Sequence, residues 1–406
     1  MLKFFRLAAC SAIALLSHPP AQGGLVINEI MANNESGVPA DGGYPDWVEI
    51  YNTGPGSVNL QGHTLTDNLT TPNKFTFTQS HTLAAGQFLV VWCSGNATLG
   101  SLHAPFSLSD SGEEVGLFGP GGNRLDSVKF GLQPPNYSIS RFPDGTGTWS
   151  LSAFTPGASN EVQPLGNPRR VVINEWMASP ASGDDWIELY NPEVLPVSIS
   201  GFYMSDATVS PATNRPLRAL SFMAAEGYLQ LFASGLAKTD GDHLDFRLNN
   251  SGETLSILTD DARTVSHRMT YGRQEANTSQ GRLPDGADNI QSFPVGKPTP
   301  AASNFVPITD VWINEVLAHT DPPFEDAVEL YNPTSLPVNI SYWWLSNAKG
   351  EPKKYRFPKN SIIQPNSYWV VYQQQFDAGN PRVPFRFNSA RGDECYLFSG
   401  DSAERL

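Results

Sequence analysis

The sequence has little cysteine and few basic residues. Only Cys10, Cys93 and Cys395 occur in 406 residues, whereas a disulfide framework needs several cysteines at short, regular spacings. The 26 Lys and Arg residues stand against 40 Asp and Glu residues, which gives a formal net charge of −14. Because this charge repels polyphosphates, we expect no nucleic-acid partner.

Long apolar runs are also lacking, except for one at the start of the chain. Lys3 and Arg6 precede an apolar run over residues 7–16, and small residues with a Pro-Pro pair follow it. This is the pattern of a secretory signal peptide, which we place at residues 1–23. Leu7 to Cys10 resembles a lipobox, but most of the run follows Cys10, so lipidation is the less favoured alternative. We predict a mature chain without a transmembrane span, secreted or held at the cell surface.

Catalytic motifs are missing too. The chain contains no G-x-S-x-G, no P-loop, no dinucleotide fingerprint and no H-E-x-x-H, so we predict that these residues form no enzyme. Cys93 and Cys395 align with apolar or tolerant positions elsewhere in the chain, as small hydrophobic residues would. His103 and His243 share a position that Val383 occupies in a third segment, which favours packing over metal binding.

What is present is a long internal repeat. The tripeptide Ile-Asn-Glu occurs three times, each time followed by Asp-(Trp/Ala)-(Val/Ile)-Glu-(Ile/Leu)-Tyr-Asn starting at Asp46, Asp185 or Asp326. A period near 140 residues indicates whole domains in tandem, because solenoid units run about 20 to 50 residues. The predicted domains are residues 25–160, 170–304 and 311–406.

Each repeat has the composition of a β-domain. Short β-branched or aromatic runs alternate with Gly, Asn, Asp, Ser and Pro at about the spacing of a sandwich. The expected strands of the first two repeats are 26–27, 47–51, 88–92, 115–118, 128–130, 186–190, 228–232 and 254–258. Pro-Asp-Gly turns end at Gly145 and Gly286, where a positive φ suits glycine. We therefore predict all-β sandwiches of seven to nine strands.

These ordered motifs resemble the lamin tail domain in its bacterial form, over nearly the whole mature chain. The resemblance rests on I-N-E, W-(I/V)-E-(L/I)-Y-N, V-x-(L/I)-x-G, F-x-L followed by S-G-E, and a late R-x-P-D-G. It implies three tandem immunoglobulin-like β-sandwiches. In bacteria such domains occur on exported multidomain proteins, sometimes beside nucleases, phosphatases or kinase-like enzymes.

The third repeat departs from this pattern. Tyr342 stands where the other repeats have Gly62 and Gly201, and no counterpart of residues 141–145 or 155–160 occurs within residues 311–406. We therefore expect the third sandwich to be incomplete at its C-terminal end.

Recurring carboxylates are the first candidates for chemistry, because oxygen ligands suit Ca²⁺. The candidate calcium sites are Asp41, Asp46 and Glu49 in the first repeat, and Asp184, Asp185 and Glu188 in the second. In the alternative interpretation, such Asn and Glu side chains bind turn backbones or pair with the recurring Arg. No D-x-D-x-D-G loop occurs, which favours this alternative.

Two functional hypotheses remain from the sequence. The first is an exported, non-enzymatic array whose domains act as binding, adhesion or spacer modules, with an unidentified protein or glycan ligand at the cell surface. The second is an accessory N-terminal region of a larger secreted enzyme, kinase-like, a nuclease or a phosphatase, whose catalytic domain would lie beyond residue 406. The lack of a catalytic set favours the first, and fold alone does not name the ligand.

Overall fold

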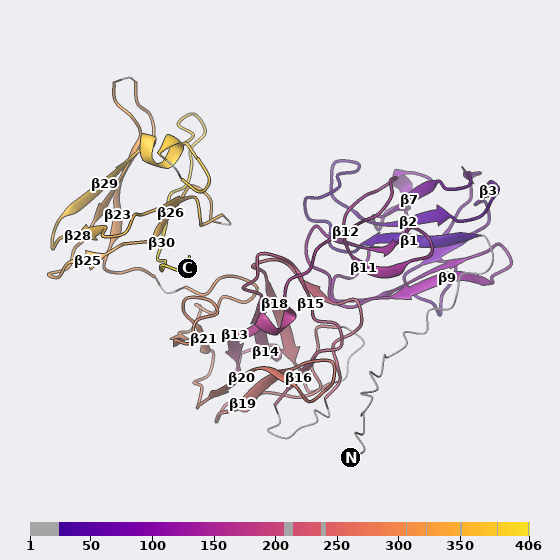
Figure 1. Ribbon diagram of the computed structural model, residues 1–406, viewed down its shortest axis with the longest axis horizontal. Coiled ribbons are helices and arrows are strands. Elements are labelled where there is room, and N and C mark those ends of the chain that lie inside the picture. The colour runs from indigo at the N-terminus through magenta and orange to yellow at the C-terminus, as the bar shows by residue number, and fades with distance from the viewer. Residues whose placement is uncertain are drawn as a thin grey trace, which may run out of the picture. The chain divides into compact units, whose positions relative to one another are not determined.

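The computed structural model describes residues 24–206, 214–236, 241–305, 307–321, 323–349, 351–379, 381–404 and 406. The predicted signal peptide lies outside these residues. In the described parts the chain is nearly all β, and every pair of the strands named below is antiparallel. The sheets fall into three successive sets along the sequence (Figure 1). We call them the first, second and third sandwich.

The first sandwich comprises β1 to β12. A six-stranded sheet has the order β12-β11-β10-β1-β2-β7, a four-stranded sheet has the order β5-β4-β8-β9, and β3 pairs with β6. The strand bounds are β1 25–31, β2 46–52, β3 58–59, β4 64–66, β5 75–76, β6 82–83, β7 88–93, β8 114–118, β9 124–129, β10 138–142, β11 148–153 and β12 161–162, and η1 is a 3-10 turn at 97–99.

The second sandwich repeats this plan with β13 to β22. Its sheets have the orders β18-β14-β13-β21-β22 and β16-β19-β20, and β15 pairs with β17. The bounds are β13 172–177, β14 185–190, β15 197–198, β16 203–205, β17 222–223, β18 228–233, β19 253–258, β20 265–271, β21 279–282 and β22 290–293, and the 3-10 turn η2 at 168–170 precedes them.

The third sandwich comprises β23 to β30. Its sheets have the orders β23-β24-β29 and β27-β26-β30, and β25 pairs with β28. The bounds are β23 312–317, β24 327–331, β25 338–339, β26 344–346, β27 355–356, β28 362–363, β29 368–372 and β30 396–398, with the short π-helix η3 at 374–378. Val328, Leu345, Phe357 and Val371 are buried between its sheets.

The structure confirms the predicted fold class and the predicted long strands. All eight expected strands lie at least partly on observed ones, and Gly145 and Gly286 have φ of 71° and 70°. The expected number of strands was too low for the first two sandwiches. Two-residue pairs such as β3 with β6 are too short to give a periodic signal in the sequence.

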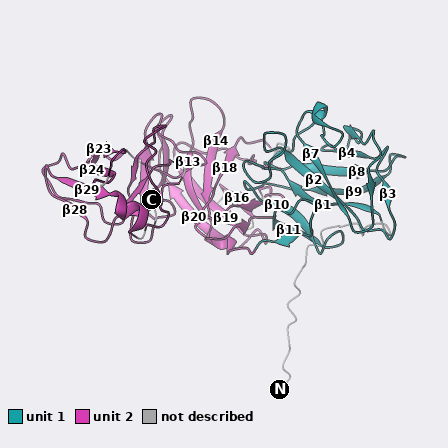
Figure 2. Cartoon of the chain, turned by 90° about the horizontal axis from the view of Figure 1, so that it is seen from above, with its two compact units in different colours: residues 1–163 teal, residues 164–406 magenta. Residues whose placement is uncertain are grey.

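The structure divides into two compact units, residues 1–163 and 164–406 (Figure 2). The first unit contains the first sandwich and the second contains the other two. The predicted boundaries at 25–160, 170–304 and 311–406 stay predictions. Among the described residues, no helix is long and apolar enough to cross a membrane.

Candidate functional site

The repeated Ile-Asn-Glu lies on the central strand of its sheet in the first two sandwiches. β1 runs between β2 and β10, and its side chains are all buried. The register of β1 against β2 shifts between Ile27 and Glu29, so Asn28 is the extra residue of a β-bulge. Successive side chains of a strand normally point to opposite faces of the sheet, and a bulge interrupts this alternation. Asn28 and Glu29 can therefore both bond to polar groups at the same end of the sandwich.

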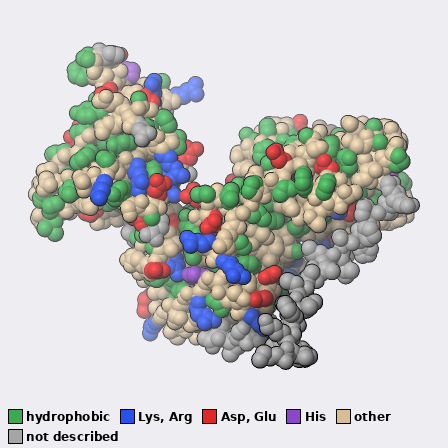
Figure 3. All heavy atoms as spheres, viewed as in Figure 1, with side chains coloured by type: hydrophobic (Ala, Val, Ile, Leu, Met, Phe, Trp, Pro, Cys, Tyr) green, Lys and Arg blue, Asp and Glu red, His purple; other side chains and the backbone are tan. Residues whose placement is uncertain are grey.

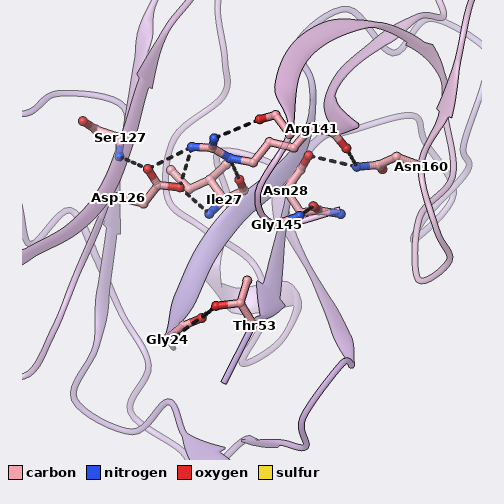
Figure 4. A network of polar contacts seen from close by, with 10 residues as sticks. Gly24, Ile27, Asn28, Thr53, Asp126, Ser127, Arg141, Gly145 and Asn160 are labelled. Carbon is pink, nitrogen blue, oxygen red and sulfur yellow. Dashed lines mark hydrogen bonds and ion pairs between the residues drawn. The ribbon is translucent and has the colours of Figure 1, made fainter. Parts of the chain in front are cut away.

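Asn28 joins β2 to the turn after β10. Its Nδ2 donates to Glu49 Oε1 at 3.0 Å and to Asp144 Oδ1 at 3.1 Å, and its Oδ1 accepts from the Gly145 backbone N–H at 2.8 Å. Asn160 Nδ2 donates to the Asn28 carbonyl at 3.2 Å (Figure 4). One amide side chain thus holds together segments more than 100 residues apart in sequence.

Glu29 binds the segment that closes the domain. Its carboxylate accepts from Ser138 Oγ and from both the backbone N–H and the hydroxyl of Thr155, the last two at 3.0 Å. Glu49 on β2 likewise accepts from the Gly157 N–H at 2.7 Å. The motif T-P-x-A-S-N, which is residues 155–160 here and recurs at 299–304, is therefore fixed to the I-N-E strand by side-chain acceptors. We call residues 138–160, and the matching 279–304, the closing segment.

Arg141 ties the same strand to the opposite sheet. Its Nε donates to the Ile27 carbonyl at 3.0 Å, and its Nη2 lies 3.1 Å from both carboxylate oxygens of Asp126. Asp126 also accepts from the Ile27 N–H at 2.9 Å. Charge-assisted bonds of this kind are stronger than neutral ones, so the recurring arginine fixes β1, β9 and β10 together (Figure 4).

The second sandwich repeats these contacts around Asn174. Asn174 Nδ2 donates to Glu188 Oε1 at 3.0 Å and to Asp285 Oδ1 at 2.8 Å, and its Oδ1 accepts from Gly286 N at 3.0 Å. The remaining repeated contacts are Ser279 and Thr299 to Glu175, and Asn304 to the carbonyls of Asn174 and Arg282. One position differs, because Arg282 Nη2 lies 3.0 Å from His267 Nε2, and the aspartate nearest to its Nη1 is the fully exposed Asp288, at 3.6 Å.

Burial changes the acid strength of these groups. Desolvation raises the pKa of Glu29 to about 7 and that of Glu49 to about 8, against hydrogen bonds that lower both. In the second sandwich burial raises the pKa of Glu188 to about 9. Desolvation disfavours the charged form of a carboxyl group, so burial shifts these carboxyl groups toward their protonated form.

The third sandwich has the same motif but not the same contacts. β23 shows the same bulge between Ile313 and Glu315, and Asn314 Nδ2 donates to Glu329 Oε1 at 2.7 Å. Asn314 and Glu315 are exposed, whereas Asn28 and Glu29 are wholly buried. No closing segment lies on β23 among the described residues of this sandwich.

The family comparison agrees with this threefold architecture. A family model of the lamin tail domain matches residues 18–131, 166–273 and 307–405. The chain belongs to the lamin tail domain family. A search of curated proteins gave no match, and a search of solved structures gave none either. The three sandwiches are therefore tandem lamin tail domains of immunoglobulin-like type.

The structure places the predicted calcium ligands apart. Asp46 and Glu49 lie three residues apart on β2 and so point to opposite faces of the sheet. Asp46 accepts from the backbone N–H groups of Asn34 and Leu108 at 3.4 and 3.1 Å, and burial raises its pKa to about 6. The Oδ2 atom of Asp41 instead lies 3.0 Å from Nε2 of His103.

The second lamin tail domain shows the same separation. Asp185 accepts from the Leu248 N–H at 3.1 Å, burial raises its pKa, and Glu188 belongs to the Asn174 network. Asp184 precedes β14 and also has a polar partner. Among the described residues, no group of three or more His, Cys, Asp or Glu side chains could hold a metal ion. The calcium hypothesis stays a prediction, and the contacts observed agree with the alternative that these acids bind turn backbones.

A serine, a histidine and an aspartate lie in a row in the first lamin tail domain. His103 Nδ1 lies 3.1 Å from Ser94 Oγ, and His103 Nε2 lies 3.0 Å from Asp41 Oδ2. Ser94 Oγ also accepts from Asn96 N and donates to Asn96 O, both at 3.3 Å. These are the contacts of a serine that caps its own turn. These three side chains therefore stabilise the loop after β7.

The closing network agrees with the favoured interpretation that the recurring Asn and Glu side chains bind turn backbones. Only R-x-P-D-G was predicted to be a turn, and neither it nor T-P-x-A-S-N was identified from the sequence as the partner of I-N-E. One feature of the sequence could have indicated these bonds. Both motifs occur in the two repeats that bury I-N-E, and neither occurs in residues 311–406. Polar residues that recur together across repeats are candidates for mutual hydrogen bonding, because buried polar groups need partners.

Proposed function

We propose that the chain is an exported, non-enzymatic array of lamin tail domains that acts through binding, as an adhesion or spacer module at the cell surface. The observation that carries this proposal is the use of the recurring polar residues. Asn28, Glu29 and Glu49 bond to backbone and side chains of their own domain. Such bonds stabilise a fold and leave these groups unavailable to a substrate.

The closing network also suits a spacer role. It links β1 with the closing segment, near the two ends of each domain's sequence, through several hydrogen bonds at once. The matching residues in the second lamin tail domain make the same link. A domain whose ends are bonded to each other resists opening from either end, which supports its use as a module in an array. The ligand would be a protein or a glycan.

Export is supported by the order of charge and apolar residues at the N-terminus. Lys3 and Arg6 precede the apolar run, as in a signal peptide. Fusing residues 1–23 to a reporter should send the reporter out of the cytoplasm, and replacing the run's Leu15 and Leu16 with Asp should retain it. A reporter that stays in the cytoplasm with the intact leader would refute export.

The binding role is tested with the full chain on intact cells and on isolated surface glycans. We expect saturable retention, no chemical change of the retained ligand, and loss of retention after thermal unfolding. Retention that is neither saturable nor dependent on the folded state would refute a binding function. Turnover of the ligand would refute the non-enzymatic part.

A further inference from the structure

Two of the three lamin tail domains hold a lysine against a side-chain oxygen within the same hairpin. β4 pairs with β5 and β26 pairs with β27, and a loop joins the strands of each pair. In the first domain, Lys74 Nζ lies 2.5 Å from Asp67 Oδ1. In the third domain, Lys354 Nζ lies 2.9 Å from Asn347 Oδ1. In both hairpins the acceptor directly follows the first strand and the lysine directly precedes the second. The two contacts are therefore equivalent, but the partner changes from a carboxylate to an amide.

Lys354 is well buried for a lysine. Its side chain is 11% exposed, against 35% for Lys74, and its Nζ lies 6.0 Å from the centre of the Phe385 ring. Figure 3 shows basic side chains of the third domain at the surface beside acidic ones. The charged partner of Lys354 is Glu351, whose Oε2 atom lies 2.9 Å from Nζ. Glu351 is therefore positioned to accept a proton from the Lys354 ammonium.

The Asn347 amide is fixed at both of its polar atoms. Its Oδ1 accepts from Lys354, and its Nδ2 donates to Asp393 Oδ2 at 3.2 Å and to the Arg386 carbonyl at 3.4 Å. Asp393 Oδ2 also accepts from the Asn388 N–H at 2.9 Å, which holds this carboxylate in place. An amine, an amide carbonyl and a carboxylate therefore meet in one place. Groups held at such distances react as if each were present at a very high concentration.

We propose that Lys354 and Asn347 become joined by a covalent amide bond, with Asp393 as the proton carrier. Glu351 first takes a proton from the Lys354 ammonium. The neutral Nζ then attacks Cγ of Asn347, so that an Nζ–Cγ bond forms and the Cγ–Nδ2 bond breaks. Asp393 accepts a proton from Nζ and passes it to Nδ2, which leaves as ammonia. The proton held by Glu351 converts this ammonia into ammonium, so no further reactant is needed.

The other two domains each lack one part of this set. Asp67 of the first domain offers a carboxylate, whose negative charge opposes attack by an amine and which has no ammonia to lose. We expect its contact with the lysine to stay an ion pair. In the second domain Asn214 stands three residues before Leu217. Lys354 precedes Phe357 by the same interval, and Leu217 and Phe357 make matching backbone bonds. The second domain therefore has asparagine where the attacking lysine would stand.

The bond would tie the end of β26 to the start of β27. It would prevent this hairpin from opening as a first step of unfolding, which suits the exported module proposed above. The inference goes beyond that proposed function, because the bond depends neither on export nor on what the array binds.

Intact-mass spectrometry of the full chain, followed by a tryptic digest, tests the proposal. We expect the chain to be lighter than its unmodified form by the mass of one ammonia. We also expect a linked peptide pair, in which the peptide that ends at Lys349 is joined to residues 354–356, because trypsin does not cleave after an acylated lysine. A succinimide at Asn347 loses the same mass but leaves Lys354 cleavable. Finding that succinimide in place of the linked pair would overturn the proposal.

Four variants make the assignment specific. Lys354→Arg keeps the positive charge and Asn347→Asp rebuilds the ion pair of the first domain, so both should keep their full masses. Asp393→Ala should lower the linked fraction of freshly purified protein about tenfold or more, because a positioned acid–base group contributes at least that much. Lys353→Arg is the matched control beside the site and should link as the parent does. Hydrogen exchange of the β26 amides shows whether each variant is folded.

Unmodified Lys354 and Asn347 in the parent chain, both freshly purified and after long incubation at alkaline pH, would overturn the proposal. A loss of ammonia that persists in Lys354→Arg would overturn it as well. A folded Asp393→Ala variant that links as completely as the parent would refute the role of Asp393. If the bond is absent while the chain still binds cells, the array function stands and this cross-link alone is refuted.

Discussion

The first and third lamin tail domains carry the same strand motif in opposite environments. Ile-Asn-Glu forms a bulged strand in both, and in both its asparagine donates to the glutamate of the next strand. In the first domain Asn28 and Glu29 are wholly buried under the closing segment, and in the third domain the matching residues are exposed. The bulged strand is therefore a local property of the motif, whereas its burial depends on a distant segment.

The largest expected effect comes from removing the asparagine in each setting. Asn28→Ala would leave the Gly145 N–H and Glu49 Oε1 without their partners inside the protein. Each unsatisfied buried group costs about 1–3 kcal/mol, so we expect the first domain to lose about 3–5 kcal/mol of stability. Asn314→Ala should cost less than about 0.5 kcal/mol, since surface changes rarely exceed that.

Hydrogen exchange resolves the two domains within one chain, because it reports local opening free energies. The amides of β1 and β23 are compared in each variant. Equal losses in the two domains would mean that the exposed asparagine matters as much as the buried one, and the contrast between the domains would not hold.

The second effect concerns pH. Burial raises the pKa of Glu49 from 4.5 to about 8, so between these values the folded first domain holds a proton that the unfolded chain has lost. Its stability is greatest below about pH 4.5 and falls as pH rises through 8, by an amount on the order of a few kcal/mol. Denaturant unfolding at several pH values measures this slope. The Glu49→Gln side chain cannot ionise, so this variant should reduce the pH dependence of the unfolding free energy. An unchanged pH dependence would mean that other groups cause it.

The third effect separates the first domain from the second. Arg141 pairs with the largely buried Asp126, whereas Arg282 lies against His267 and a fully exposed aspartate, Asp288. Burial lowers the pKa of His267 from 6.5 to about 4, so the folded second domain binds fewer protons than the unfolded chain. The stability that this gives is present above about pH 6.5 and is lost as pH falls toward 4.

His267→Asp should remove that acid sensitivity. It would also add about 1 kcal/mol at neutral pH, by rebuilding the ion pair of the first domain. Unfolding of the second domain at pH 7 and pH 5 is the measurement, with His243→Gln as the control for a histidine outside the network. A variant that loses as much stability on acidification as the parent would show that His267 is not the sensor.

Local residue patterns account for most of the fold. The strands at Trp47 and Trp186 follow from β-branched and aromatic runs, and the turns at Gly145 and Gly286 follow from Pro-Asp-Gly. The network around Asn28 could not be derived in this way, because its partners lie 116 and 132 residues away. Sequence periodicity describes faces of strands and says nothing about which distant turn a polar side chain will meet.

The smallest expected effect is that of calcium, and it tests whether the recurring acids do more than close the fold. Asp46 and Glu49 face opposite sides of β2, and each already accepts backbone hydrogen bonds. A calcium ion would have to displace those bonds and gather six to eight oxygen ligands. We therefore expect the melting temperature in millimolar Ca²⁺ and in chelator to agree within about one degree, because only a ligand that prefers the folded state raises it. Asp41→Asn serves as the matched variant, since Asp41 is the exposed member of the predicted set. A saturable rise of several degrees that Asp41→Asn abolishes would instead establish a calcium site in the loop before β2.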